Sequence, residues 1–502
     1  MRIFAAMRPL ALILLLSPLF LFAQDKKEPI NINHADYLDY NKNYANADRL
    51  IGNVSMSQGN TTLSCDSAWF WKSENRMEAF GHAYLIQSGG ITVSSDYMMY
   101  DGNSKTAFAQ RNVRMSDGKM SLTTDVVQYD VTNKIASYVT GGKIVDGENT
   151  MTSRSGSYHT KTREYFFKGK IKLVNPEYTM ESDTLNYNGN KKTAYFFGPT
   201  YIYSADNLLF CNYGWYNTQN NTCQFSKRAY IISKENRIDS DSFLYNRNTG
   251  IGRAFGNILL RDTLHKITIR GGKGVHHRFE KTTLITGDPI AFKEFEEDTV
   301  FIKAKFLFDK LDTATNKRTL AAYRDAKIFK PDVQGVADSL SYSLSDSVIR
   351  FFYNPILWNE SNQTTGDTIY IFQKGKAMDK MDVLQNAMII MKEDSLKYNQ
   401  IKGKKLNALF ADNKLYKVHV RGNGQSVYYA KEDTSDYMGV NYVECTNMII
   451  NIDENKVKKV TFLVSPKGTF YPLDKFPEEK SRLRGFNWSI DKRPMRKEFL
   501  RK

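Results

Sequence analysis

The sequence predicts an all-β fold: an elongated, β-solenoid-like array of strand-turn-strand repeats. Three observations support this fold class. A short motif recurs at a nearly fixed spacing, turn-forming residues follow it, and apolar and polar residues alternate in the flanking segments. A period of about 30 residues is typical of stacked repeats, in which each unit buries its apolar face only against its neighbours.

Each repeat begins with a small polar residue, and an aromatic residue or histidine follows four positions later. Successive starts lie 28 to 30 residues apart. The starts are Asp66, Asp96, Asp125, Ser155, Asp183, Asn212 and Asp241, and the positions that follow are Phe70, Tyr100, Tyr129, His159 (beside Tyr158), Tyr187, Tyr216 and Tyr245. Catalysis needs a single constellation of groups, so we interpret the recurring aspartates as structural turn or strand-end residues.

Turn-forming residues occupy the same place in successive repeats. They read Asp101–Lys105 in one copy, then Asp130–Lys134, Asn188–Lys191 and Asn246–Gly250 in later copies. Asp, Asn and Gly tolerate the left-handed backbone conformation that tight turns require. The repeating unit is therefore predicted to be a hairpin.

Apolar residues alternate with polar ones in the strands, as Val113 and Met115 do with Asn112 and Arg114. Alternate side chains of a strand lie on one face, so each repeat contributes apolar groups to an inner lane. The predicted lane consists of Ile91, Val93, Val113, Met115, Met120, Leu122, Ile171, Leu173, Ile258, Leu260, Ile267 and Ile269. The pattern leaves open whether this lane is a packed core or a groove. Tyr201, Tyr203 and Tyr230 are large enough to fill it.

The amino terminus has the layout of a secretory signal. Arg2 and Arg8 precede the apolar run 10–22, and cleavage is expected near Ala23, with an uncleaved anchor as the alternative. Export permits disulfides, and Cys211 and Cys223 flank a predicted turn. They are candidates for a disulfide, with two buried free thiols as the alternative.

We divide the chain by pattern into five segments. They are a signal peptide (1–23), a lead-in (24–47), the regular array (48–360), its continuation (361–475) and a basic irregular tail (476–502). The net charge is +16, and ten basic residues lie in the last 28 positions. Such a tail fits a solvated extension, or one that contacts an anionic membrane.

The sequence lacks a recognisable catalytic, metal-binding or cofactor-binding motif. His276 and His277 are adjacent in a predicted strand, so they point to opposite faces. Gly271–Gly274 is glycine-rich but lacks the spacing of a phosphate-binding loop. We therefore expect a non-enzyme without cofactor or metal, and export argues against nucleic acid as a partner.

A glycine followed by alternating apolar residues recurs in 52–56, 80–84, 168–172 and 255–259, with related segments at 399–403, 420–424 and 485–488. On these residues the chain resembles the OstA/LptA family of lipopolysaccharide-transport proteins, and in particular the long OstA-like proteins of Bacteroidetes. The resemblance covers roughly the segment from residue 48 to 490.

This resemblance implies a twisted β-jellyroll trough in the periplasm, or associated with the outer membrane, that carries lipopolysaccharide between the two membranes and assists outer-membrane assembly. The twelve lane residues would hold the acyl chains, and Lys and Arg along the rim would meet the phosphates. Other β-jellyroll transport proteins at the inner and outer membranes would be partners through end-to-end strand pairing. The alternative is a structural or adhesive β-solenoid that binds a surface partner or glycan and carries no lipid.

Overall fold

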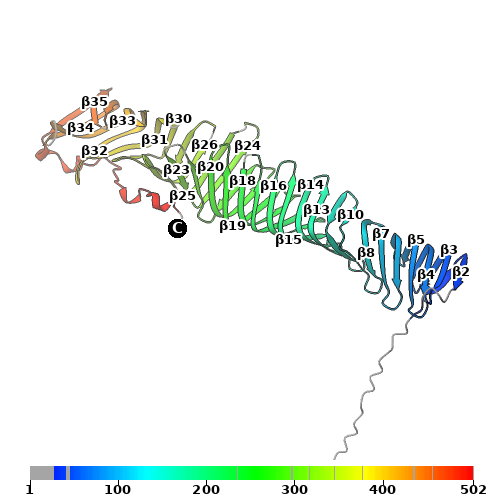
Figure 1. Ribbon diagram of the computed structural model, residues 1–502. Helices are drawn as coiled ribbons and strands as arrows, with labels where there is room; N and C mark the ends of the chain where they lie inside the picture. Colours follow the sequence, from blue (N-terminus) through cyan, green and yellow to red (C-terminus); the bar gives the residue numbers. More distant parts are fainter. Residues whose placement is uncertain are drawn as a thin grey trace, which may run out of the picture. The chain divides into compact units, whose positions relative to one another are not determined.

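The computed structural model describes residues 28–40, 46–234, 236–294, 298–315, 317–343, 345–375, 377–432, 436–454 and 456–500. They form 36 strands and four 3-10 turns, and the strands pair antiparallel with their neighbours. The predicted all-β class is confirmed. The chain divides into two compact units, 1–140 and 141–502 (Figure 1). The expected signal peptide and the last two basic residues lie outside the described residues.

Unit 1 is a meander in which each long strand pairs with the one before it. Its strands are β1 Asn31–His34, β2 Tyr37–Tyr40, β3 Asp48–Gln58, β4 Thr61–Trp71, β5 Arg76–Gln87, β6 Ile91–Asp101, β7 Thr106–Ser116, β8 Met120–Asp130 and β9 Ile135–Tyr138. The short β1 and β2 pair side by side along the two halves of β3.

Unit 2 continues the same strand-turn-strand pattern. Its first strands are β10 Gly142–Asp146, β11 Asn149–Ser153, β12 Ser155–His159, β13 Glu164–Asn175, β14 Tyr178–Asn188, β15 Thr193–Ser204, β16 Leu208–Asn217, β17 Thr222–Ile232, β18 Asn236–Asn246, β19 Ile251–Asp262, β20 Ile267–His277, β21 Thr282–Thr286, β22 Ile290–Glu294 and β23 Thr299–Lys303. The remaining strands are β24 Phe306–Asp312, β25 Lys317–Lys330, β26 Val333–Ser343, β27 Val348–Phe352, β28 Ile356–Asn359, β29 Asn362–Thr365, β30 Thr368–Lys374, β31 Ala377–Lys392, β32 Tyr398–Ala411, β33 Lys414–Glu432, β34 Asp436–Asp453, β35 Lys456–Leu463 and β36 Lys467–Tyr471. The change of pattern predicted near residue 360 falls inside this unit.

About every second long strand bends at its middle through two consecutive residues with left-handed backbone angles. In β5 these are Gly81 (φ 72°) and His82 (φ 42°), and in β19 they are Gly256 (φ 74°) and Asn257 (φ 44°). The pairing register shifts at the same points. The recurring glycine motif therefore marks a bend that gives each unit two walls. The first wall contains the residues that follow the bend in strands such as β5 and β19, and the second wall contains the residues that precede it.

The recurring aspartates sit beside these bends. Asp66 contacts His82 Nδ1 at 2.8 Å, and Asp241 accepts a hydrogen bond from Asn257 Nδ2 at 3.0 Å. The hydrogen bond to Asp66 and the negative charge of the Asp66 carboxylate raise the pKa of His82. The structural role predicted for these aspartates is confirmed, but their predicted position at turns or strand ends is wrong. They lie in mid-strand, where the neighbouring strand turns its corner.

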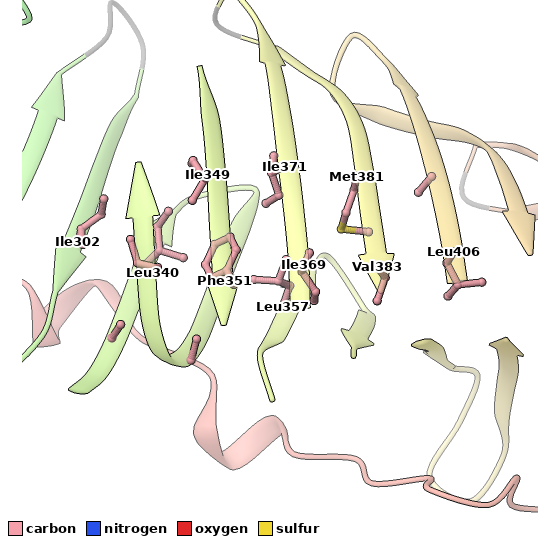
Figure 2. Packing of buried hydrophobic residues seen from close by; sticks show 14 of the residues in the cluster. Ile302, Leu340, Ile349, Phe351, Leu357, Ile369, Ile371, Met381, Val383 and Leu406 are labelled. Atoms are coloured by element: carbon pink, nitrogen blue, oxygen red, sulfur yellow. The ribbon is translucent and has the colours of Figure 1, made fainter. Parts of the chain in front are cut away.

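Apolar side chains of the two walls pack against one another to form the interior. In unit 2, one continuous cluster joins Leu260 and Ile302 of the first wall to Leu307 and Phe351 of the second. Figure 2 shows part of this cluster, with side chains on successive strands directed to a common interior. Alternation along each strand thus determines the core, as the sequence predicted.

Residues 473–500, here called the strap, run back over the outer face of unit 2 as far as β23 and β25 (Figure 1). The strap contains the four 3-10 turns Leu473–Lys475, Glu478–Lys480, Ile490–Lys492 and Arg496–Glu498. Leu483 packs with Val427, and the Phe499 ring lies 5.8 Å from that of Phe329. The described part of the basic tail is therefore docked rather than solvated.

Two buried glutamines hold the strap backbone. Gln363 Nε2 donates to the carbonyl of Asn487 (2.6 Å), and its Oε1 accepts from the amide of Ser489 (2.8 Å). Gln400 Nε2 donates in the same way to the Ser481 carbonyl (2.7 Å), and its Oε1 accepts from the amide of Leu483 (2.8 Å). Each side-chain amide thus replaces a strand as the hydrogen-bonding partner of an irregular segment.

Replacing Gly81 with alanine is expected to lower the free energy of unfolding by about 2–3 kcal/mol. The left-handed angle accounts for part of this cost. The added Cβ would also lie 2.3 Å from Asp66 Oδ2. Gly89→Ala is the matched control, because Gly89 has φ +107° but nothing within 4 Å of the new methyl group. Urea denaturation of both full-length variants provides the test, and equal losses would refute the role of the Asp66 contact.

Candidate functional site

The lane residues predicted in unit 1 are fully enclosed between the two walls. Ile91, Val93, Val113, Met115, Met120 and Leu122 are all at most 7% exposed. Val93, Met115 and Leu122 pair directly across neighbouring strands. In unit 1 the lane is therefore a packed core.

The lane residues predicted in unit 2 fall into two groups. Ile171, Ile258, Leu260, Ile267 and Ile269 are buried, whereas Leu173 retains part of its surface. Leu173 pairs with Met180 on the next strand. This pairing continues across the following strands, through residues in the same inner position, as far as Leu260. Five of these are only half-buried and form what we call the accessible row: Leu173, Ile202, Leu209, Ile231 and Ile238.

The second wall opposite the accessible row is lined by buried phenylalanines. Phe196, Phe225 and Phe243 are each at most 7% exposed, and they occupy paired positions on β15, β17 and β18, with Gly214 of β16 between Phe196 and Phe225. A Cβ on Gly214 would lie 2.2 Å from the Phe196 ring, so only glycine allows this close approach. An accessible apolar row thus faces a rigid aromatic wall.

The large aromatics considered as groove fillers lie on the opposite face of the sheet. Tyr201 and Tyr203 flank Ile202 in sequence, so they point outward where Ile202 points inward. Tyr201, Phe210 and Tyr230 lie in a row with successive ring centroids 4.9 Å apart, the first pair tilted and the second stacked. Most of the accessible row could not be predicted from the sequence, because both faces of β15–β17 are apolar there and the alternation of apolar and polar residues is lost.

Beyond β19 the interior closes again. A cavity of about 20 Å³, lined by Ile267, Lys293, Val300, Tyr342 and others, lies between the walls. This volume accommodates about one water molecule. Burial lowers the pKa of Lys293 below its ordinary value. The cavity is too small for an acyl chain, so the accessible row is the best candidate for a binding site.

Polar contacts, here called latches, join the rims of the two walls. In unit 1 the Gln58 side chain bridges to the second wall, since its Nε2 donates to the Gly102 carbonyl (2.8 Å) and its Oε1 accepts from the Tyr100 hydroxyl (2.7 Å). Gln87 makes the equivalent contacts with Tyr129 and with the carbonyl of Val131. The predicted repeat aromatics therefore serve as rim closures as well as core residues.

Unit 2 carries two charged latches. Asp262, whose side chain is 1% exposed, pairs with Arg318, and Arg318 Nε also donates to Asp309 Oδ1 at 2.8 Å. The second latch joins Glu177, in the turn between β13 and β14, to Arg247, in the turn after β18. The first is buried, and the second lies exposed over the accessible row.

All four cysteines are free and buried, so the suggested disulfide between Cys211 and Cys223 is not formed. Register explains this outcome. Cys223 pairs with Tyr216, whereas Cys211 pairs with Thr200 beyond the bend, so the two are not cross-strand neighbours. Burial raises the pKa of the Cys211 thiol and that of the Cys223 thiol to about 12.

The part of the chain that the structure describes has neither a membrane-spanning helix nor a cluster of metal-ligating side chains. Within it, helices are confined to short turns, and none has the length and apolar character needed to cross a membrane. The same residues contain no group of three His, Cys, Asp or Glu side chains arranged to hold a metal ion.

Antiparallel strands bent into two walls around an apolar interior define a β-jellyroll class of protein. Residues 27–183 and 181–241 match the model of the family described as OstA-like protein, and this part of the chain belongs to that family. None of the curated proteins matches the sequence significantly.

Among solved structures, the chain is similar to LptH from Pseudomonas aeruginosa, described as the LptA-homologous periplasmic component of the conserved lipopolysaccharide transport device. The identity is 10% and the TM-score 0.20, over 23% of this chain and 79% of LptH.

Proposed function

We propose that the protein is a periplasmic component of lipopolysaccharide transport that holds acyl chains against the accessible row and helps to assemble the outer membrane. The observation that carries the proposal is the half-buried row Leu173, Ile202, Leu209, Ile231 and Ile238, opposite a phenylalanine wall. Membership of the OstA-like family over residues 27–241 supports it.

The energetics favour lipid over a small polar ligand. Each methylene removed from water contributes about 0.8 kcal/mol, so an apolar row on five strands retains acyl chains without a specific polar site. Such binding depends on area rather than on geometry, which suits a carrier that must also release its cargo. The buried lane elsewhere in unit 2 and in unit 1 stabilises the fold.

Photo-crosslinking tests the proposal. A photoreactive residue in place of Ile202 or Leu209 is expected to form ultraviolet-dependent adducts with purified lipopolysaccharide, because both side chains face the interior and remain accessible. Tyr203 is the matched control, since it lies one residue from Ile202 but on the outer face and is 41% exposed. Failure of Ile202 and Leu209 to form adducts, while a known carrier is labelled in parallel, would refute lipid binding here.

Association with other β-jellyroll transport proteins is proposed to occur end to end. Among the described residues, β1 and β2 pair only with β3, and β35 and β36 pair only with β34. These strands therefore present unpaired backbone groups that accept a further strand. In this arrangement the protein forms part of a bridge between the inner and outer membranes.

A second function, adhesion to a surface partner or glycan, is favoured by one observation. The outer face of β15–β17 carries six apolar or aromatic side chains: Tyr201, Tyr203, Leu208, Phe210, Tyr230 and Ile232. Exposed aromatic patches of this kind often mark interaction surfaces. Adducts with a non-lipid partner at Tyr203, without lipid adducts at Ile202, would favour this function over transport.

A further inference from the structure

The four latches differ in how readily they can open. The two in unit 1 use neutral, buried side chains, since Gln58 is 3% exposed and Tyr100 is fully buried. The Asp262–Arg318 latch is charged, and its carboxylate is buried. In the Glu177–Arg247 latch the side chains are 64% and 40% exposed, respectively. Exposed ion pairs contribute little to stability, so this latch is the easiest to break.

The exposed latch lies over a cluster of tyrosines. Arg247 contacts Glu177 Oε2 at 2.5 Å through one terminal nitrogen and donates to the Tyr216 hydroxyl at 3.4 Å through the other. Burial raises the pKa of Tyr178, and Tyr216, Arg247, Glu177 and Tyr187 all act on it electrostatically. One guanidinium and several tyrosine side chains therefore gather at one point of the rim, where the Tyr216 hydroxyl accepts from Arg247 and donates to Asn221 Oδ1 at 2.7 Å.

The position of this cluster relates it to the accessible row. Tyr178 begins β14, two residues before Met180, which pairs with both Leu173 and Ile202. Tyr216 projects from the opposite wall, two residues from Gly214 in the phenylalanine wall. A molecule with acyl chains on the accessible row would thus present its head group to Arg247.

We propose that Arg247 binds a phosphate on the head group of the bound lipid. In the absence of lipid, Glu177 forms an ion pair with Arg247, and the lipid phosphate displaces the Glu177 carboxylate when it binds. Arginine binds phosphate through two parallel charge-assisted hydrogen bonds. The Glu177 carboxylate makes a single contact and carries less negative charge than a phosphate. Tyr216, whose hydroxyl accepts from Arg247 and donates to Asn221, keeps the guanidinium at the rim. This inference rests on the proposed function, because the phosphate must belong to a lipid held in the accessible row.

The two partners of the latch are expected to have opposite effects on affinity. Arg247→Gln should weaken the binding of phosphorylated lipopolysaccharide about tenfold, because one charge-assisted contact is lost. Glu177→Gln should strengthen it by about threefold, because the competing anion is removed. Neither variant should change binding of the same lipopolysaccharide after phosphatase treatment. Fluorescence titration of the full-length chain measures all three effects.

Matched controls separate a site from net charge. Arg253→Gln and Glu181→Gln make the same charge changes at exposed positions outside the latch, and both should leave affinity unchanged. Equal effects of the two arginine variants, or saturable binding of inorganic phosphate alone at Arg247, would overturn the head-group assignment. If lipid bound at Ile202 with unchanged affinity in both latch variants, this inference would be overturned but the proposed function would not. Absence of lipid binding in every protein would instead overturn the proposed function.

Discussion

Replacing Asp262 with asparagine is expected to lower the free energy of unfolding by about 3 kcal/mol, the low end of the range for a broken buried ion pair. The Asp262 carboxylate accepts a hydrogen bond from the backbone amide of His265 at 2.8 Å and pairs with Arg318. An asparagine amide retains the first contact but turns a donor toward the guanidinium. Chemical denaturation of the full-length protein measures the loss.

An exposed ion pair of the same type is the control. Asp325 and Lys305 lie 2.7 Å apart with both side chains more than 60% exposed, so Asp325→Asn should change stability by less than about 0.5 kcal/mol. If both variants lost the same stability, the buried latch would have no special role.

The same latch predicts how stability depends on pH. Burial alone would raise the pKa of Asp262, but the hydrogen bonds from His265 and the charge of Arg318 outweigh it and lower that pKa below its ordinary value. The contribution of Asp262 is therefore fully present above the pKa of the unfolded carboxyl and is lost as pH falls through the folded value. Asp262→Asn should flatten the acid side of the stability profile, whereas a profile parallel to that of the unaltered protein would contradict this assignment.

Truncating Leu483 to alanine is expected to destabilise unit 2 by about 3 kcal/mol, within the range for large-to-small substitutions in cores. Leu483 is 4% exposed and packs with Val427 on the outer face, while its amide is held by Gln400. Loss of the side chain leaves a cavity beneath an irregular segment that has no strand partner. Hydrogen exchange should show reduced protection in β32 and β33.

Leu473→Ala is the matched control within the same strap. Leu473 is 38% exposed, so its truncation should cost less than about 0.5 kcal/mol. Unchanged protection of β32 and β33 in the Leu483→Ala variant would show that the strap does not stabilise the sheet it covers.

Alternation and repeat spacing were sufficient to predict the all-β class and to place the twelve lane residues on the inner faces, where eleven of them are buried. This success has a physical reason: in a half-buried strand, burial follows the two-residue period directly. Leu173 was the exception, because its exposure depends on how far the walls close at that repeat. At that repeat the two rims meet through Glu177 and Arg247, which lie 70 positions apart in the sequence.

Some of the bends and the docking of the strap could not be predicted from the sequence, for different reasons. At Arg111 and Asn112 both left-handed residues are non-glycine, so residue type alone does not mark that bend. The strap lacks periodicity, and its docking depends on Gln363 and Gln400, whose buried amides resemble surface glutamines in the sequence. Both features arise from contacts between strands rather than from local preference.

The strap also bears on how the protein is made. Its residues are synthesised after β36, so every nascent chain has its β31–β34 face, with Ile390 and Val427, uncovered until the strap has been made. Uncovered apolar strands invite aggregation, and an early stop or a protease cut after β36 would make that vulnerable stage permanent. Quality control of this protein therefore depends on whether the strap is present to cover these strands.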